Sequence, residues 1–172
     1  AACELAAEIL PRVRRAVPGA EALIVGRDPS RRVLALGRQP GVTVTGFVPD
    51  VRPYLERAAV FAAPLRSGAG IQNKVLEAMA MEVPVVVSPV GAEGLRTERG
   101  DRPPVELASG RDEFADAIVA RLHAAAADPT PDAAGRRYVE SHFDWAASGW
   151  KLEVVLARAA AEVSQELGAA NE

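Results

Sequence analysis

Cysteine, histidine and aromatic side chains are scarce in this chain of 172 residues. Cys3 is its one cysteine, His123 and His142 are its two histidines, and aromatic residues make up 5% of the total. A single thiol cannot form an internal disulfide, and so few sulfur and imidazole ligands disfavour a zinc centre. We therefore predict no metal site, and the composition suits a reducing, cytoplasmic compartment.

Long apolar runs are absent too. Runs such as residues 83–87 are far shorter than the roughly 20 residues that a transmembrane helix needs. The first eight residues carry Glu4 and Glu8 but no basic residue, unlike a signal peptide, and no methionine starts the chain. We expect no transmembrane segment, while peripheral membrane contact stays open, and we interpret the chain as part of a longer protein.

An excess of positive charge is also missing. The chain has 20 basic and 23 acidic residues, a net charge of −3. A protein that binds a phosphate backbone needs a basic face, so we expect no nucleic-acid partner. Lys74 and Lys151 are the only lysines, because arginine supplies every other basic residue.

Short apolar runs alternate with helical patterns along the chain. The runs predict strands at 22–26, 41–46, 59–63, 84–88 and 105–108. The helical patterns lie at 3–17, near 31–36, after a capping Asp50, and at 71–81, 111–127 and 144–167, with residues 89–95 as a loop. This alternation predicts an α/β fold with a doubly wound, Rossmann-like parallel sheet.

We interpret the whole chain, residues 1–172, as one domain, with residues 131–168 as a C-terminal helical extension. Trp145, Leu152, Val155 and Leu156 could pack the last helix back across the sheet. In such sheets ligands bind beyond the carboxyl ends of the strands. The loops after Gly26, Gly46, Ala63 and Ser88 are therefore the places to look for a site.

Most of the candidate ligand-binding residues lie between Arg66 and Glu77. A small-residue loop follows a strand and leads into a helix, whose first N–H groups lack partners and attract anions. Helical spacing puts Gly70, Asn73, Lys74 and Glu77 on one stripe, and Ile71, Val75, Ala78 and Met79 on an apolar face. Glu77 lies about 10 Å along the axis from Gly70, so one nucleotide diphosphate would span a phosphate site and a sugar site.

Two other phosphate motifs do not fit this loop. The dinucleotide fingerprint needs a third glycine where Asn73 stands. The G-x-x-x-x-G-K-[ST] loop has Asn73 for its glycine and Val75 for its metal-binding hydroxyl, so neither an NAD enzyme nor a magnesium-dependent NTPase is supported. A plainer interpretation also stays open, in which the glycines make a turn and Lys74 and Glu77 are a solvated helix face.

Several segments carry a resemblance to a known family. Residues 70–80, 84–86 and 91–95, with 22–26 and 44–50 before them, resemble the C-terminal, donor-binding domain of retaining family 4 glycosyltransferases, which have the GT-B fold. The likeness covers about residues 5–95, and more loosely residues 143–145. It implies a nucleotide-diphospho-sugar donor and metal-independent transfer of a hexosyl group, without a cofactor, in polysaccharide or glycoconjugate biosynthesis.

The resemblance assigns roles to particular positions. The residue matching Glu77 binds the donor ribose, the helix start and nearby basic side chains hold the diphosphate, and the loop matching residues 46–48 flanks the base. The implied donor-binding residues are Gly26, Arg27, Phe47, Val48, Arg66, Gly68, Gly70, Ile71, Gln72, Asn73, Lys74 and Glu77. The catalytic residues on the acceptor side stay unknown.

Three departures from the family pattern stand out. Ala69 occupies the position of a second glutamate, and Glu82 replaces the glycine that usually ends the helix, so we expect no left-handed cap there. The family's domain also begins with a strand before the first helix, which we do not find. Because the acceptor site of such enzymes lies in an N-terminal domain, we expect this chain alone to be inactive as a transferase.

Two other functions stay open at this point. One is a nucleotide-sugar epimerase of the same GT-B architecture, whose catalytic residues would lie partly outside this chain. The other is a non-catalytic, receiver-like α/β module, which would want a cluster of acidic residues at the first strand ends, where only Asp28 is near.

Overall fold

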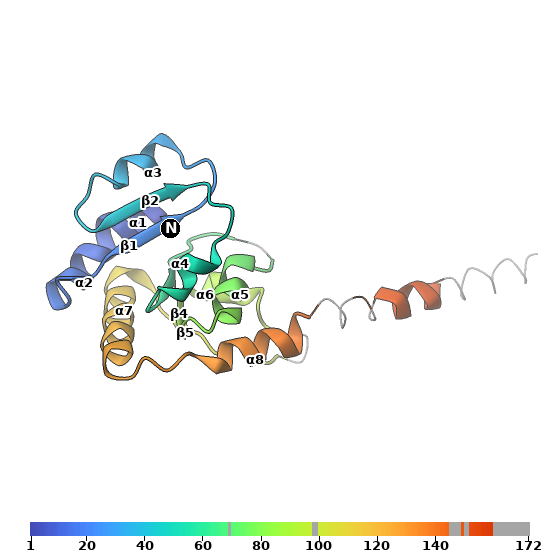
Figure 1. The fold of residues 1–172 in the computed structure, drawn as a ribbon. Coiled ribbons are helices and arrows are strands. Elements are labelled where there is room, and N and C mark those ends of the chain that lie inside the picture. The colour runs from blue at the N-terminus through green and yellow to red at the C-terminus, as the bar shows by residue number, and fades with distance from the viewer. Residues whose placement is uncertain (69, 98–99, 145–148, 150–151, 160–172) are drawn as a thin grey trace, which may run out of the picture.

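The computed structural model describes residues 1–68, 70–97, 100–144, 149 and 152–159, and shows strands alternating with helices (Figure 1). The strands are β1 (Ala22–Val25), β2 (Val42–Gly46), β3 (Phe61–Ala63), β4 (Val85–Val87) and β5 (Glu106–Leu107). The helical elements are α1 (Ala2–Glu4), η1 (Leu5–Ile9), α2 (Leu10–Ala16), α3 (Arg31–Leu36), α4 (Arg52–Glu56), α5 (Asn73–Ala80), α6 (Pro89–Glu93), α7 (Gly110–Ala127) and α8 (Ala133–His142). The predicted α/β class is confirmed.

The strands are parallel, but they form two hydrogen-bonded sheets instead of one. β1 pairs with β2, and β4 lies between β3 and β5. Helices cover both faces of the larger sheet: Val86 packs into a cluster with α2 and α7, while Val85 and Val87 pack into a second cluster with α5 and α6. This doubly wound arrangement explains why β4 is a continuous apolar run.

Elements α1, η1 and α2 follow one another without a break, and we call them together the first helix. This helix contains one wide turn. In η1, the N–H of Leu10 donates to the carbonyl of Leu5, five residues earlier. Pro11 follows directly, and it has no N–H to donate to Ala7 and crowds that carbonyl with its ring. A π-type turn between α1 and α2 accommodates this proline without ending the helix.

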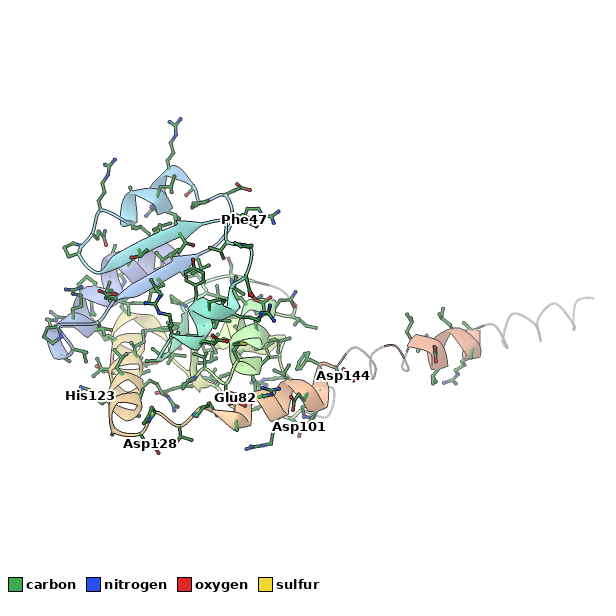
Figure 2. All side chains as sticks on the ribbon, in the orientation of Figure 1. Phe47, Glu82, Asp101, His123, Asp128 and Asp144 are labelled. Atoms are coloured by element: carbon green, nitrogen blue, oxygen red, sulfur yellow. The ribbon has the colours of Figure 1, made fainter. Side chains whose placement is uncertain are left out.

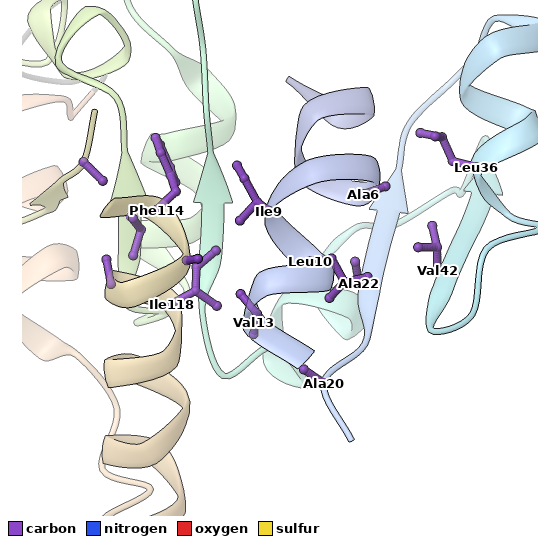
Figure 3. Close-up of a cluster of buried hydrophobic side chains, with 14 residues drawn as sticks. Ala6, Ile9, Leu10, Val13, Ala20, Ala22, Leu36, Val42, Phe114 and Ile118 are labelled. Carbon is purple, nitrogen blue, oxygen red and sulfur yellow. The ribbon is translucent and has the colours of Figure 1, made fainter. Parts of the chain in front are cut away.

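The same helix joins the two sheets into one core. Figure 3 shows Ile9, Leu10 and Val13 between Ala22 and Val42 on one side and Phe114 and Ile118 on the other. Ile9 and Val13 are almost fully buried, at 0% and 1% exposure. These residues belong to one cluster that reaches from β2 to α7.

Two helices were not predicted as separate elements, although the second lies within the predicted helical extension 131–168. Residues 89–93 form α6 instead of a loop, with Ser88 at its N-cap and Pro89 in its first turn. Residues 133–142 form α8, whose N-cap residue Asp132 accepts a hydrogen bond from the N–H of Ala134 at 3.2 Å. Both helices begin with a polar N-cap residue next to a proline. This signal was missed because neither segment has a long apolar pattern at helical spacing.

Helix α5 begins two residues later than predicted and ends in a way that was not expected. Glu82 adopts a left-handed conformation (φ 60°). The N–H of Val83 donates to the carbonyl of Ala78 and that of Glu82 to Met79, at 3.0 Å each, which is the Schellman arrangement. The left-handed cap is therefore present, although a glutamate instead of a glycine occupies it.

The last described segment, residues 152–159, is helical as predicted. Leu152, Val155 and Leu156 are 59–63% exposed, so the expectation that they pack across the sheet is wrong. Trp145 lies outside the described residues. Within the described part of the chain, no helix has the length and apolar character needed to span a bilayer.

The position of Ile9 generates a stability prediction. We expect Ile9→Ala to lower the free energy of unfolding by about 2–5 kcal/mol, because it leaves a cavity between the two sheets. Urea unfolding followed by circular dichroism measures this loss. Leu34→Ala, at a position that is 52% exposed, is the matched control and should cost about 0.5 kcal/mol or less. Equal small losses in both variants would contradict the bridging role of the helix.

Candidate functional site

The predicted loop and helix come together at the carboxyl end of β3. The backbone at Gly70 is left-handed (φ 71°), a conformation that glycine adopts without steric cost. A Cβ added to Gly94, after α6, would lie 2.1 Å from the carbonyl oxygen of Gly70. Two glycines thus let the loop after β3 meet the end of α6. Gly94 belongs to residues 91–95, one of the segments that resemble the family, but the sequence analysis gave it no role at the site.

Helix α5 presents the expected polar face. Asn73, Lys74 and Glu77 are exposed, while Val75, Ala78 and Met79 are at most 1% exposed. The N–H groups of Asn73 and Lys74, in the first turn, have no acceptor within the helix. This end of the helix therefore offers both hydrogen-bond donors and partial positive charge.

One expectation about this helix is wrong. Ile71 precedes the helix and is 54% exposed, so it does not belong to the apolar face. Because the helix begins at Asn73, Glu77 lies only about 6 Å along the axis from the first helical residue. This is shorter than the distance expected between a phosphate site and a ribose site. The phosphate site would therefore have to extend beyond the helix to the loop residue Gly70, which is not helical.

Lys74 and Glu77 carry charges that are not used in salt bridges within the described part of the chain. Among the residues that the structure describes, neither of them forms an ion pair, whereas Arg12, Arg111 and Arg121 each lie 2.6 Å from a carboxylate oxygen. Both side chains line a groove between β1 and β3, together with Pro64 and Leu65. Their charges therefore remain available to a ligand.

This groove lies where the strand order changes direction. Its volume is about 630 Å³, and its walls include Ala22–Val25 of β1 and Phe61–Ala63 of β3; we call it the interstrand groove. From it, β1 and β2 extend to one side and β3, β4 and β5 to the other. Ligands of doubly wound folds bind at such a switch point, beyond the carboxyl ends of the strands.

Arg27 and Phe47 form a second group, at the ends of β1 and β2. The guanidinium carbon of Arg27 lies 4.8 Å from the centroid of the Phe47 ring, a cation–π contact. Phe47 is 61% exposed at this edge (Figure 2), and Val48 beside it is half-buried. The N–H of Gly26 donates to the carbonyl of Gly46 and so holds the two loops together.

Arg66 is occupied by another partner. Its Nε and Nη2 donate to the two carboxylate oxygens of Glu4 at 2.8 and 2.7 Å. This side-chain hydrogen bond is the main reason why the pKa of Glu4 lies below its usual value. The structure places Arg66 beside the first helix, and no contact joins it to Lys74 or Glu77 among the described residues.

The remaining predicted residues lie in the connecting loop. Gly68 is exposed, and a Cβ added there would approach the side-chain nitrogen of Gln72 at 3.1 Å. Gln72 is the N-cap residue of α5, and its carbonyl accepts from Val75 at 2.8 Å and from Leu76 at 3.2 Å. Ala69 lies outside the described residues.

A second hollow adjoins the ends of β3, β4 and β5. It has a volume of about 650 Å³ and is lined by Arg66, Ser88 and Arg111 among others. Ser88 is 8% exposed, and its hydroxyl has no hydrogen-bond partner among the described residues. No group of three or more histidine, cysteine, aspartate or glutamate side chains within the described part of the chain could hold a metal ion.

Comparison with solved structures supports this architecture. Two structures of Anabaena HepE, one with UDP and one with UDP and glucose, superpose with TM-scores of 0.70 and 0.69. Each is 17% identical in sequence and is matched over 87% of this chain. The match covers 44% and 43% of those chains, so this chain spans less than half of their length. What the two proteins share at this level of identity is the fold.

Sequence comparison assigns the family. Over 73 residues, 41% of this chain, it is 41% identical to the putative teichuronic acid biosynthesis glycosyltransferase TuaC of Bacillus subtilis (strain 168), and the match covers 18% of that protein. The model of the family described as glycosyl transferases group 1 matches residues 1–124, most of the chain. The chain therefore belongs to the family of group 1 glycosyl transferases.

Proposed function

We propose that this chain is the donor-binding domain of a retaining glycosyltransferase that takes a nucleotide-diphospho-sugar. The observation that carries the proposal is the pair Lys74 and Glu77 at the switch point, both exposed and neither in an ion pair among the described residues. They lie next to the N–H groups of the α5 start that have no acceptor within the helix. A diphosphate would lie against those N–H groups and Lys74. The ribose hydroxyls would donate to the Glu77 carboxylate.

The rest of the donor has candidate partners as well. Phe47 and Val48 would flank the base, with the Phe47 ring already in contact with Arg27. Metal-independent transfer of a hexosyl group is also part of the proposal. By analogy with the activity printed for TuaC, the product would be a polysaccharide or another glycoconjugate.

Family membership favours this function over the alternatives. An epimerase of the same architecture would also hold a nucleotide on α5, but the matching family model is one of glycosyl transferases. A receiver-like module would need an acidic cluster at the strand ends, and the described residues contain none of metal-binding size. An acceptor-binding domain and a cytoplasmic location remain part of the proposal.

The first test uses the 172-residue chain itself. Because the acceptor site is proposed to lie elsewhere, we expect the chain to bind UDP or another nucleoside diphosphate in calorimetric titrations but to transfer no sugar from a nucleotide-sugar panel. EDTA should leave the affinity unchanged. Sugar transfer by the purified chain, or loss of binding in EDTA, would overturn the corresponding part of the proposal.

A second prediction concerns Lys74. We expect Lys74→Ala to weaken diphosphate binding by about 10- to 150-fold, the equivalent of one charge-assisted hydrogen bond of about 1.5–3 kcal/mol. Binding of the nucleoside without phosphate should change little, and added salt should narrow the gap between the two proteins. Arg32→Ala, an exposed cation on α3, is the control that should bind normally. An equal loss for nucleoside and diphosphate would instead indicate a structural role.

A third prediction tests whether Glu77 binds the ribose or is only an exposed helix residue. If Glu77 accepts hydrogen bonds from both vicinal hydroxyls, the protein should prefer the ribonucleotide over its 2′-deoxy analogue by about 10- to 150-fold. We expect Glu77→Ala to lose affinity for the ribonucleotide together with most of this preference. Glu56→Ala, on the exposed face of α4, should keep both. An undiminished preference in Glu77→Ala, measured by calorimetry, would remove Glu77 from the site.

A further inference from the structure

Helix α8 packs closely against α5, the helix of the candidate site. A Cβ added to Gly135 of α8 would lie 3.3 Å from the Cα and from the carbonyl oxygen of Met79 in α5, so the two backbones are in contact there. The N–H of Asp132, which caps α8, donates to the carbonyl of Glu82 at 2.9 Å. Helix α8 is thus docked on the buried side of the helix whose first turn is the candidate phosphate site.

Tyr138 reaches from α8 to the chain that follows α6. Its hydroxyl donates to the carbonyl of Leu95 at 2.7 Å and lies 3.2 Å from the carbonyl of Asp101. Its ring packs against the cluster that contains the buried face of α5, and its centroid lies 4.7 Å from that of His142. A phenol has one proton to donate, and the shorter distance assigns it mainly to Leu95. Among the described residues, no other group donates to the Leu95 carbonyl.

The surroundings of Tyr138 keep its hydroxyl protonated. Burial is the main cause that raises the pKa of Tyr138 above its usual value, and the negative charge of Asp101 adds to the effect. The phenol therefore remains a hydrogen-bond donor at neutral pH, which its two carbonyl partners require.

The carbonyl that Tyr138 holds follows directly after the glycine on which the loop into α5 rests. A Cβ added to Gly94 would lie 2.1 Å from the carbonyl oxygen of Gly70 and 3.1 Å from the nitrogen of Ile71. The backbone at Gly94 has a φ of −72°, which any residue can adopt. It is therefore the contact with the Gly70–Ile71 peptide, and not the backbone conformation, that requires a glycine at this position.

Few hydrogen bonds hold that peptide. Among the described residues, neither Gly70 nor Ile71 forms a backbone hydrogen bond, and the Ile71 side chain is 54% exposed. The carbonyl of the next residue, Gln72, already accepts from the first turn of α5. The position of the peptide therefore depends on its contact with Gly94.

We propose that Tyr138 is a positioning residue for the phosphate end of the donor site. Its hydroxyl holds Leu95 and hence Gly94 in place, and Gly94 supports the Gly70–Ile71 peptide from which α5 starts. Glu77, one turn further along α5, is not part of this chain of contacts, so binding of the nucleoside should not depend on it. The inference rests on the proposed function for its ligand, and its test therefore includes a measurement without ligand.

The first experiment removes the hydroxyl alone. Tyr138→Phe keeps the ring that packs against α5. Thr97→Val is the matched control, because it removes another hydroxyl from the same loop, one that bonds to Asp101. Calorimetric titrations use UDP and uridine, and GDP and guanosine. We expect Tyr138→Phe to weaken diphosphate binding by about 5- to 30-fold, because a small misplacement of a binding group costs much affinity. Nucleoside binding should stay unchanged, and the control should keep both affinities.

A second variant perturbs the same chain of contacts from its other end. The Cβ of Gly94→Ala would displace the carbonyl of Gly70 directly. We expect it to weaken diphosphate binding by about tenfold or more, again without loss of nucleoside binding. Because both changes act through one contact, the double variant should lose less affinity than the product of the two single losses. If Gly94→Ala does not fold, Tyr138→Phe and its control still decide.

A measurement without ligand separates this inference from the proposed function. In amide NMR spectra of the free chain, the resonance of Ile71 should shift in Tyr138→Phe and stay in place in Thr97→Val. If the unchanged chain binds neither UDP nor GDP, the proposed donor function is wrong, and the Ile71 resonance alone then decides whether Tyr138 positions this loop.

The proposal fails if Tyr138→Phe binds both diphosphates as tightly as the unchanged chain, or if the Ile71 resonance does not move. Equal losses of diphosphate and nucleoside affinity would indicate a general loss of structure instead. The same loss in Thr97→Val would mean that the stability of the whole loop matters and not the bond to Leu95. Fully additive losses in the double variant would also contradict the proposal, because Tyr138 and Gly94 would then act separately.

Discussion

The packing of the first helix between the two sheets is the interaction on which the rest of the structure depends. The sheets share no hydrogen-bonded ladder among the described residues, so Ile9, Leu10 and Val13 connect them through apolar contact (Figure 3). Apolar burial stabilises the core at roughly 25 cal/mol per Å² but has no direction. It can therefore hold β1 near β3 without closing the space between them, and the interstrand groove is the consequence.

Directional interactions then place the site relative to this core. The contact of Glu4 with Arg66 ties the start of the first helix to the end of β3, although exposed ion pairs contribute only about 0–1 kcal/mol. The close approach of Gly94 to Gly70 sets the path of the loop into α5. Neither contact uses Lys74 or Glu77. Other residues therefore make the contacts that position the loop and the helix, and the charges of Lys74 and Glu77 are available to a ligand.

The sequence allowed the strands, most of the helices and most of the buried face of α5 to be predicted, because these depend on local spacing. Apolar runs marked the strands, and Val75 and Ala78 were correctly assigned to the buried face. Division of the sheet could not be predicted, since strand pairing is a property of distant residues. The partner of Arg66 lies 62 positions away, and nothing near Arg66 in the sequence indicates it. Ile71 was misplaced because a shift of two residues in the helix start changes which side chains share a face.

The candidate site and the space between the two sheets occupy the same place. Lys74 and Glu77 line the groove between β1 and β3, whose facing edges pair with no strand among the described residues. Local stability is lowest where backbone groups lack partners, and functional loops are drawn from such regions. Anything that binds there and not to the unfolded chain stabilises the whole domain by mass action. Ligand binding in this groove is therefore coupled to the stability of the core that surrounds it.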